Sequence, residues 1–98
     1  MVKKKNNIVI PKSLTPEEVA IRTEVIAIKE KLLDKNVWAE FGKNILLKKN
    51  KVEFMQEFFD CSKEVAEFLM TLSLFELQST PDALERERQL LLEGKAYI

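Results

Sequence analysis

Hydrophobic residues recur every three to four positions along most of the chain, which is the spacing of an α-helix. The first such stretch starts at Thr15-Pro16, where a capping hydroxyl precedes a proline at the first helical position, and runs to about Asp34. On a helical wheel its apolar residues form two stripes, so we expect this helix to contact two neighbours, or one neighbour and a partner. The first stripe contains Ile21, Val25, Ile28 and Leu32, and the second contains Val19, Ile26 and Leu33.

Two shorter helices are predicted in the middle of the chain. One covers residues 37–48 with Asn36 as its N-cap, and the other covers residues 52–59. Gly42 lies inside the first of these helices and disfavours it by about 1 kcal/mol relative to alanine.

A small hairpin is an alternative structure for the same region. In that arrangement residues 45–47 pair with residues 52–54, and the lysine-rich segment 48–51 forms the turn. The sequence therefore does not decide whether residues 42–54 form a helix, a loop or a hairpin.

The most apolar segment of the chain follows Ser62, which is placed to cap a helix over residues 63–77. Apolar side chains cover most of its helical wheel and leave Glu67 and Thr71 as the main polar edge. Such a helix is either the central core element or is partly covered by another chain. We therefore predict a partner interface that consists of Phe68, Thr71, Leu72, Leu74 and Phe75.

A last helix starts at Thr80-Pro81, another cap followed by a proline, and Gly94 is placed to end it. The predicted fold is all-α: a compact bundle of about five short helices with a helix-turn-helix-like core and a flexible basic arm. We assign the basic amino-terminal arm to residues 1–13, the helical domain to residues 14–94, and the carboxy-terminal tail to residues 95–98.

Residues 51–72 resemble a helix-turn-helix motif in outline, over about a fifth of the chain. An apolar helix is followed by a tight turn, a serine cap and a second helix with apolar periodicity. Gln56 stands where the motif usually has a small residue, and Asp60 replaces the turn glycine. Aspartate tolerates the left-handed backbone conformation, so the turn can still form.

The would-be recognition helix has the wrong charge for reading DNA. It carries one lysine, Lys63, against three glutamates, which gives a net charge of −2. Specific DNA-binding modules depend on neutralising phosphates, so this helix would be repelled. The three glutamates are Glu64, Glu67 and Glu76.

Charge is distributed unevenly along the chain, although the formal net charge is zero. Residues 1–51 carry twelve basic and six acidic side chains, whereas residues 52–98 carry four basic and ten acidic ones. This asymmetry indicates a nucleic-acid or acidic partner for one end, or two ends that attract each other in the fold. If nucleic acid is bound, we expect the contacts to be Lys3, Lys4, Lys5, Lys12, Lys43, Lys48, Lys49 and Lys51.

Composition predicts a single folded domain, because 46% of the 98 residues are hydrophobic and 33% are charged. The lone cysteine, Cys61, excludes an internal disulfide and suits a reducing compartment.

The longest apolar-rich stretch, residues 65–77, is too short to span a bilayer, and no signal peptide is apparent. We therefore expect a cytoplasmic protein without a membrane partner. Thirteen lysines against three arginines are typical of a low-GC bacterium, plasmid or phage.

The sequence offers no constellation of catalytic or metal-binding residues. Histidine, the commonest general base and metal ligand, is absent. One cysteine cannot form a zinc site, and neither a calcium-binding loop nor a glycine-rich phosphate loop is present. Acidic neighbours of Cys61 in the sequence oppose a reactive thiolate there. We therefore predict no enzymatic activity, no cofactor, no metal and no small-molecule substrate.

Two functions follow from these patterns. The first is a non-catalytic interaction or regulatory module, which binds a protein partner or self-associates through an apolar helical surface. The alternative is a helix-turn-helix-like nucleic-acid-binding or transcription-associated protein, which uses its lysine-rich amino-terminal half. The apolar circumference of residues 65–77 and the absence of catalytic residues favour the first.

Overall fold

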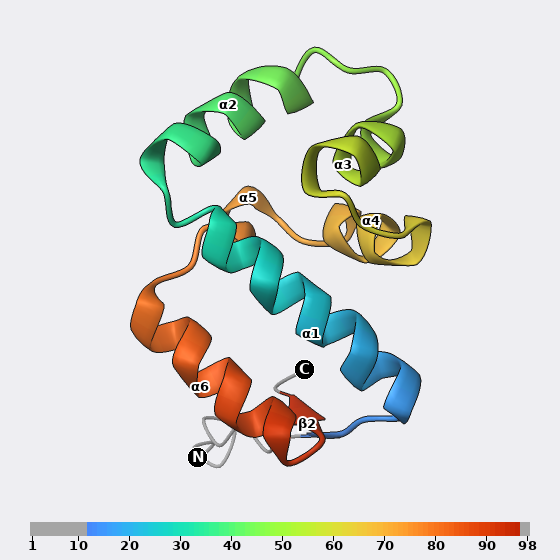
Figure 1. The fold of residues 1–98 in the computed structure, drawn as a ribbon, viewed down its shortest axis with the longest axis vertical. Helices are drawn as coiled ribbons and strands as arrows, with labels where there is room; N and C mark the ends of the chain where they lie inside the picture. The colour runs from blue at the N-terminus through green and yellow to red at the C-terminus, as the bar shows by residue number, and fades with distance from the viewer. Residues whose placement is uncertain (1–11, 97–98) are drawn as a thin grey trace, which may run out of the picture.

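The computed structural model describes residues 12–96, and over this range it contains six helices and one two-stranded sheet (Figure 1). The predicted all-α class is confirmed. The molecule measures 45 × 30 × 23 Å, and α1 runs diagonally through its centre. The elements are β1 (Lys12–Ser13), α1 (Pro16–Lys31), α2 (Lys35–Ile45), α3 (Lys51–Phe59), α4 (Lys63–Met70), α5 (Leu74–Leu77), α6 (Pro81–Leu92) and β2 (Lys95–Ala96).

Side-chain caps start three of the helices where the sequence predicts them. At α1, the Thr15 hydroxyl accepts a hydrogen bond from the backbone N–H of Glu18, and the Glu18 carboxylate accepts one from the backbone N–H of Thr15. Ser62 and Thr80 cap α4 and α6 in the same way, each accepting from the backbone N–H three residues later. These contacts are local, so they follow directly from the sequence.

Helix α2 differs from its prediction at both ends. Its N-cap is Asp34 rather than Asn36, because the Asp34 carboxylate accepts from two backbone N–H groups at 2.8 and 3.3 Å. The helix ends at Ile45, and the chain passes through a loop over residues 46–50 before α3 begins at Lys51. The hairpin alternative is therefore wrong.

The prediction of one continuous helix over residues 63–77 is also wrong, because the helix is interrupted after Met70. The Thr71 hydroxyl donates to the backbone carbonyl three residues earlier at 2.6 Å. The Ser73 hydroxyl then accepts from the backbone N–H of Glu76, whose carboxylate accepts from the backbone N–H of Ser73. These side-chain hydrogen bonds give the backbone an alternative to continuing the helix. As a result the chain turns towards α6 instead of extending past its neighbours.

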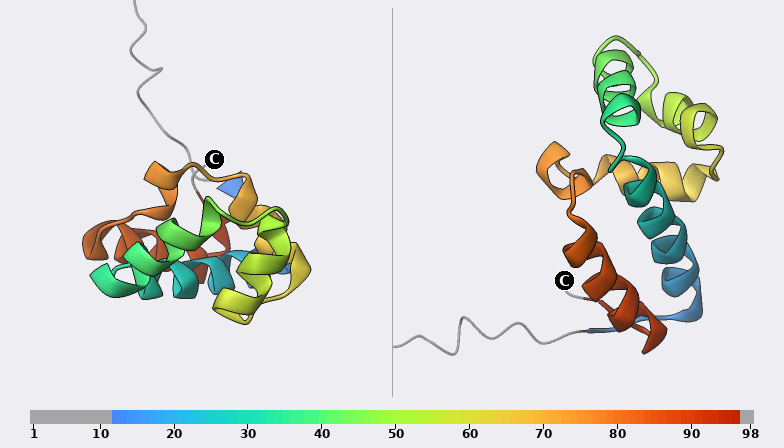
Figure 2. Two further views of the ribbon diagram at one scale, coloured as in Figure 1. Left: turned by 90° about the horizontal axis from the view of Figure 1, so that it is seen from above. Right: turned by 60° about the vertical axis from the view of Figure 1, so that its left-hand side comes forward.

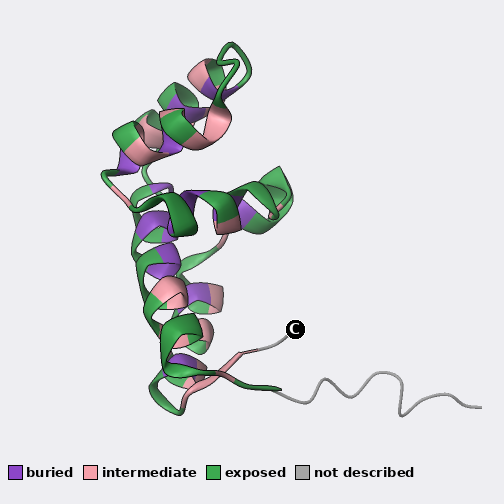
Figure 3. Ribbon diagram, turned by 90° about the vertical axis from the view of Figure 1, so that its right-hand side faces the viewer, coloured by how far each residue is buried: buried purple, intermediate pink, exposed green. Residues whose placement is uncertain are grey.

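Two hydrophobic cores meet at α1, as its two apolar stripes predict (Figure 3). The smaller core joins Ile26 to Leu84 and Leu91 of α6, with Val19 packed against it. Leu33 departs from the second stripe: it lies beyond the end of α1 and is 38% exposed. The larger core contains Val25, Ile28, Leu32, Phe41, Ile45, Met55, Phe59, Val65, Ala66, Leu69 and Leu77.

Phe41 lies at the centre of an aromatic cluster within the larger core. Its ring is fully buried, and its centroid is 5.4 Å from that of Phe59 and 5.9 Å from that of Phe58. Trp38 and Phe54 lie slightly farther away, each at 6.1 Å. The cluster joins α2 to α3 and fixes this end of the molecule.

The two chain ends of the described region meet in the small sheet. Strands β1 and β2 are antiparallel, with Lys12 opposite Ala96 and Ser13 opposite Lys95. Helix α6 lies antiparallel to α1, and Gly94, with φ +72°, ends it as predicted and leads into β2 (Figures 1 and 2). The rest of the predicted arm and the end of the predicted tail lie outside the described residues.

Candidate functional site

A groove of about 510 Å³ opens between α1, α4, α5 and α6. Three of the five predicted interface residues, Phe68, Leu72 and Phe75, line it together. Thr71 and Leu74 are exposed but do not form part of its wall. The opposite wall was not predicted, and it comes from Ala83, Leu90 and Leu91 of α6 and from Lys95 and Ala96 of β2.

Apolar exposure increases from the floor of the groove to its rim. Phe68 and Leu72 are half-buried against the larger core, whereas Phe75 is 86% exposed. Leu74 beside it is 55% exposed. Only part of the segment 65–77 therefore leaves apolar side chains exposed to solvent. Its other apolar side chains are buried within the chain's own core.

Charged side chains surround this apolar surface. The Arg22 guanidinium lies 5.0 Å from the centroid of the Phe68 ring, which is the distance of a cation–π contact. Lys29 is only 8% exposed, and its ammonium is 3.3 Å from the carboxylate of Glu87. The backbone hydrogen bond of the α5 capping box is the main cause that holds the pKa of Glu76 below its ordinary value, and the Lys29 ammonium adds to the effect. The rim therefore carries both signs of charge.

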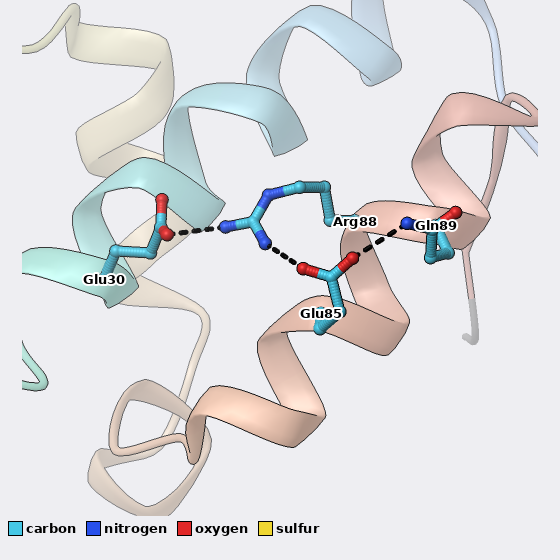
Figure 4. A network of polar contacts seen from close by, with 4 residues as sticks. All are labelled: Glu30, Glu85, Arg88 and Gln89. Carbon is cyan, nitrogen blue, oxygen red and sulfur yellow. Dashed lines mark hydrogen bonds and ion pairs between the residues drawn. The ribbon is translucent and has the colours of Figure 1, made fainter.

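A polar network on the surface holds α6 against α1 (Figure 4). The Arg88 guanidinium is 2.6 Å from the carboxylate of Glu30 on α1 and 2.6 Å from that of Glu85 on α6. Gln89 donates a further hydrogen bond to Glu85 at 2.8 Å. The Gln89 amide and then Arg88 lower the pKa of Glu85. These contacts link α1 and α6, which both contribute residues to the lining of the groove.

The structure separates the lysines proposed for nucleic-acid contact. Lys43, Lys48 and Lys49 are exposed at the end of α2 and in the following loop. Lys12 lies on β1 at the opposite end of the long axis (Figure 1). The predicted contacts Lys3, Lys4 and Lys5 lie outside the described residues.

Lys51 has a structural role within this set. Its ammonium donates hydrogen bonds to the backbone carbonyls of Ile45 and Lys48, both at 2.9 Å. The carbonyls at the end of a helix lack intrahelical partners, so Lys51 satisfies one at the end of α2 and one in the loop. Lys48 in turn extends over the ring of Phe54, 5.8 Å from its centroid.

Helices α3 and α4 pack against each other in the predicted helix-turn-helix outline. Asp60 adopts the left-handed conformation with φ 54° and ψ 53°, and its backbone N–H donates to the carbonyl of Gln56. The exposed surface of α4 is predominantly acidic, however, because Lys63 is its one basic residue beside Glu64 and Glu67. The packed helix pair and its tight turn are present, but α4 lacks the basic surface that phosphates require.

Cys61 is a half-buried thiol at the same turn. It donates a weak hydrogen bond to the carbonyl of Met55 at 3.6 Å. Burial raises the pKa of the Cys61 thiol, and the carboxylates of Glu24 and Asp60 raise it further. Because the thiolate is the reactive form, these surroundings suppress nucleophilic chemistry.

Within residues 12–96, no three acidic or cysteine side chains lie close enough together to hold a metal ion. Every helix in this range is too short or too polar to cross a membrane. Together, these observations describe a small all-α domain with an apolar groove between its helices. No protein-family model matches the chain, and comparisons with curated proteins and with solved structures found no significant match.

Proposed function

We propose that this protein is a non-catalytic interaction module whose groove binds an amphipathic helix of a partner protein. The observation that supports this function is Phe75, which is 86% exposed at the rim of an apolar groove. Apolar side chains left in water beside a concave apolar surface are typical of a protein-binding site. Phe68 and Leu72 continue the same surface into the groove.

The size and charge of the groove fit a helix with an acidic flank. Its volume of about 510 Å³ lies within the range of about 300–1,000 Å³ that is usual for small-molecule pockets, so it has room for a few apolar side chains from one face of a helix. An amphipathic helix fills such a groove with apolar side chains spaced by three or four residues. Glu87 pairs with Lys29, and Glu93 lies 3.9 Å from Lys95, so Arg22 is the groove-lining cation without an ion pair among the described residues. An acidic residue beside the apolar stripe of the partner would complement Arg22.

A second copy of the chain is a poorer occupant than another protein. Its exposed large apolar side chains are scattered over different elements, and no helix among residues 12–96 presents them as an exposed stripe. The described part of the chain therefore offers no preformed apolar helix face with which a second copy could fill the groove. These side chains are Leu33, Leu46, Leu47, Met70, Leu74, Phe75 and Leu92.

Site-specific photo-crosslinking in a lysate of the native host tests this function. Ser79→Cys, in a Cys61→Ser background, places a crosslinker in the groove wall, and Ala39→Cys on exposed α2 provides the matched control position. We expect one heterologous partner that is captured from the groove position alone. Equal capture from both positions would contradict the proposal, as would a product that contains only this chain.

Binding of the purified partner then tests the role of the groove quantitatively. We expect Phe75→Ser to weaken the affinity by at least about tenfold, the scale of an interface hot spot, in isothermal titration calorimetry. Leu92→Ser is the matched control, since Leu92 is 77% exposed at the end of α6 and lies outside the groove. The proposal fails if the two substitutions have the same effect.

Removal of the last two residues distinguishes a partner from the chain's own tail. Ala96 lines the groove, so Tyr97 and Ile98 follow directly from its wall in the sequence. If these residues were the natural occupant, the shortened chain would bind the partner more tightly. We expect its affinity to be unchanged.

A second candidate function is nucleic-acid binding, which the α3–α4 geometry and the exposed Lys43, Lys48 and Lys49 favour. Binding of duplex DNA across a salt series tests it, because affinity from phosphate contacts falls steeply with salt. If this function holds, Lys48→Ala with Lys49→Ala weakens binding to all sequences equally. No binding at low salt, or an affinity independent of salt, excludes it.

A further inference from the structure

We infer that the loop between α2 and α3 docks on an anionic lipid surface. We call residues 43–51 the lysine–leucine tip. Leu46 and Leu47 are 76% and 77% exposed, so two adjacent aliphatic side chains project into solvent at this point. They are separate from the groove, and the inference goes beyond the protein-binding function proposed above.

The charged side chains nearest the two leucines along the chain are lysines, and the flanking Glu40 carboxylate accepts a hydrogen bond from the Asn44 amide at 3.0 Å. Residues 41–52 contain four lysines and no acidic residue. Lys43, Lys48 and Lys49 are exposed beside the leucines, whereas Lys51 is half-buried. The tip therefore combines exposed aliphatic surface with exposed lysines, which complements a negatively charged lipid surface.

Hydrogen bonds fix the shape in which the tip is presented. Lys51 ties the carbonyls of Ile45 and Lys48 together, and the Asn50 side chain accepts from the backbone N–H of Glu53 at 3.0 Å to cap α3. The backbone N–H of Leu47 donates to the carbonyl of Asn44 at 3.0 Å. A loop that is already ordered loses less conformational entropy on binding.

The bilayer interface satisfies both parts of the tip at once. Its headgroup layer accepts lysine ammonium groups, and the start of the acyl region accepts the leucines a few ångströms deeper. DNA phosphates would pair with the lysines but leave Leu46 and Leu47 without an apolar partner. A second copy would bring together two clusters of like charge. A lipid surface is therefore the occupant that the tip complements best.

The position of the tip allows contact with a flat surface. In Figure 1 the loop between α2 and α3 lies at the top of the molecule, at one extreme of its long axis. The sheet and the adjoining ends of α1 and α6 lie at the other extreme. A lipid surface can therefore reach the tip without covering the groove. Such a contact needs no membrane-spanning segment, and it departs from the sequence-based expectation of no membrane partner.

Vesicle co-sedimentation of the full chain tests the inference. We expect binding to vesicles of phosphatidylcholine mixed with phosphatidylglycerol and none to pure phosphatidylcholine. Lys48→Gln with Lys49→Gln should lower the partition coefficient by about 25-fold, since each lysine near an anionic surface contributes about fivefold. Leu46→Ser with Leu47→Ser should lower it by at least about tenfold.

Matched variants provide the controls. Leu92→Ser removes an equally exposed leucine from α6, and Lys31→Gln with Lys35→Gln removes two exposed lysines where α1 ends and α2 begins. We expect both to bind vesicles like the unmodified chain. All four variants alter exposed positions, and circular dichroism with urea unfolding verifies that each one folds.

Three results would overturn the inference. The first is equal binding to neutral and anionic vesicles. The second is unchanged vesicle binding by the leucine double variant, which would show that only the lysines of the tip contribute to binding. The third is displacement from anionic vesicles by a short DNA duplex that binds more tightly, which would assign the lysines to nucleic acid. None of these results depends on the groove or its partner.

Discussion

Phe41 is the largest fully buried side chain among residues 12–96. Its ring lies among four other aromatic rings from α2 and α3. The sequence predicts its inward direction, because Val37, Trp38 and Ile45 share its helical face. The partners that α3 supplies were not predictable, since they depend on how the loop after Ile45 folds back.

Replacement of Phe41 by alanine is expected to destabilise the domain severely. Loss of a buried aromatic side chain costs about 3–5 kcal/mol, a large part of the total stability of a small domain. Urea unfolding followed by circular dichroism measures the loss. Leu92→Ala is the control and should change the free energy of unfolding by less than about 0.5 kcal/mol, because Leu92 is 77% exposed. Equal effects would contradict the assigned core.

Lys29 pairs with a residue that is distant in the sequence. Its place between the two apolar stripes of the first helix is evident from the sequence. Its partner is Glu87, 58 residues away along the chain. Nothing local indicates this pair, because it depends on α6 lying beside α1.

At the scale of elements, the turn between α3 and α4 depends on one backbone conformation. Asp60 is the one non-glycine residue with positive φ among residues 12–96. The left-handed conformation costs an L-residue about 1–2 kcal/mol, least for aspartate and asparagine, and glycine avoids this cost. The sequence predicts this turn correctly from Asp60 and the Ser62 cap that follows it.

Substitution at Asp60 should therefore affect stability in opposite directions. We expect Asp60→Gly to leave the free energy of unfolding unchanged or to raise it by up to about 1 kcal/mol. Asp60→Val should lower it by at least about 1 kcal/mol, because a β-branched residue tolerates positive φ poorly. Thermal and urea unfolding measure both. A stable valine variant would show that the turn does not need the left-handed conformation.

The interruption between α4 and α5 was missed although its signal is local. Ser73 and Glu76 have the spacing of a capping box, and both of its hydrogen bonds form. Apolar periodicity continues across this point and hides the signal. A serine followed three residues later by a glutamate should therefore be read as a new helix start even within an apolar run.

At the scale of the whole molecule, the network around Arg88 joins α1 to α6. We expect Arg88→Gln to lower the urea midpoint at neutral pH and the difference to shrink in high salt, because the charges are partly exposed. The pKa of Glu85 lies below its ordinary value of 4.5, mainly through Gln89 and then Arg88.

The same network gives the pH dependence a definite sign. A lowered pKa in the folded state stabilises the fold above the ordinary pKa, and this contribution is lost as the pH falls through the folded value. The difference between the unmodified chain and Arg88→Gln should therefore be largest at neutral pH and narrow in acid below 4.5. Urea titrations over a pH series measure it, with Lys35→Gln as an exposed control. A difference that grows in acid would contradict the assignment.

The sequence by itself determined the features that depend on neighbours three or four residues apart. These are the all-α class, the caps at Thr15, Ser62 and Thr80, the turn at Asp60 and the two stripes of the first helix. Each involves hydrogen bonds or side-chain spacing within a single turn of helix, so the chain specifies it before it folds.

Tertiary structure alone decided the groove and the lysine–leucine tip. The groove exists because α6 lies along α1 and brings Leu90 and Ala83 opposite Phe68 and Leu72. The tip exists because α2 ends early and Lys51 holds the loop. Both depend on contacts between segments whose proximity is set by packing of the two cores, and apolar periodicity identifies buried faces without specifying which faces meet.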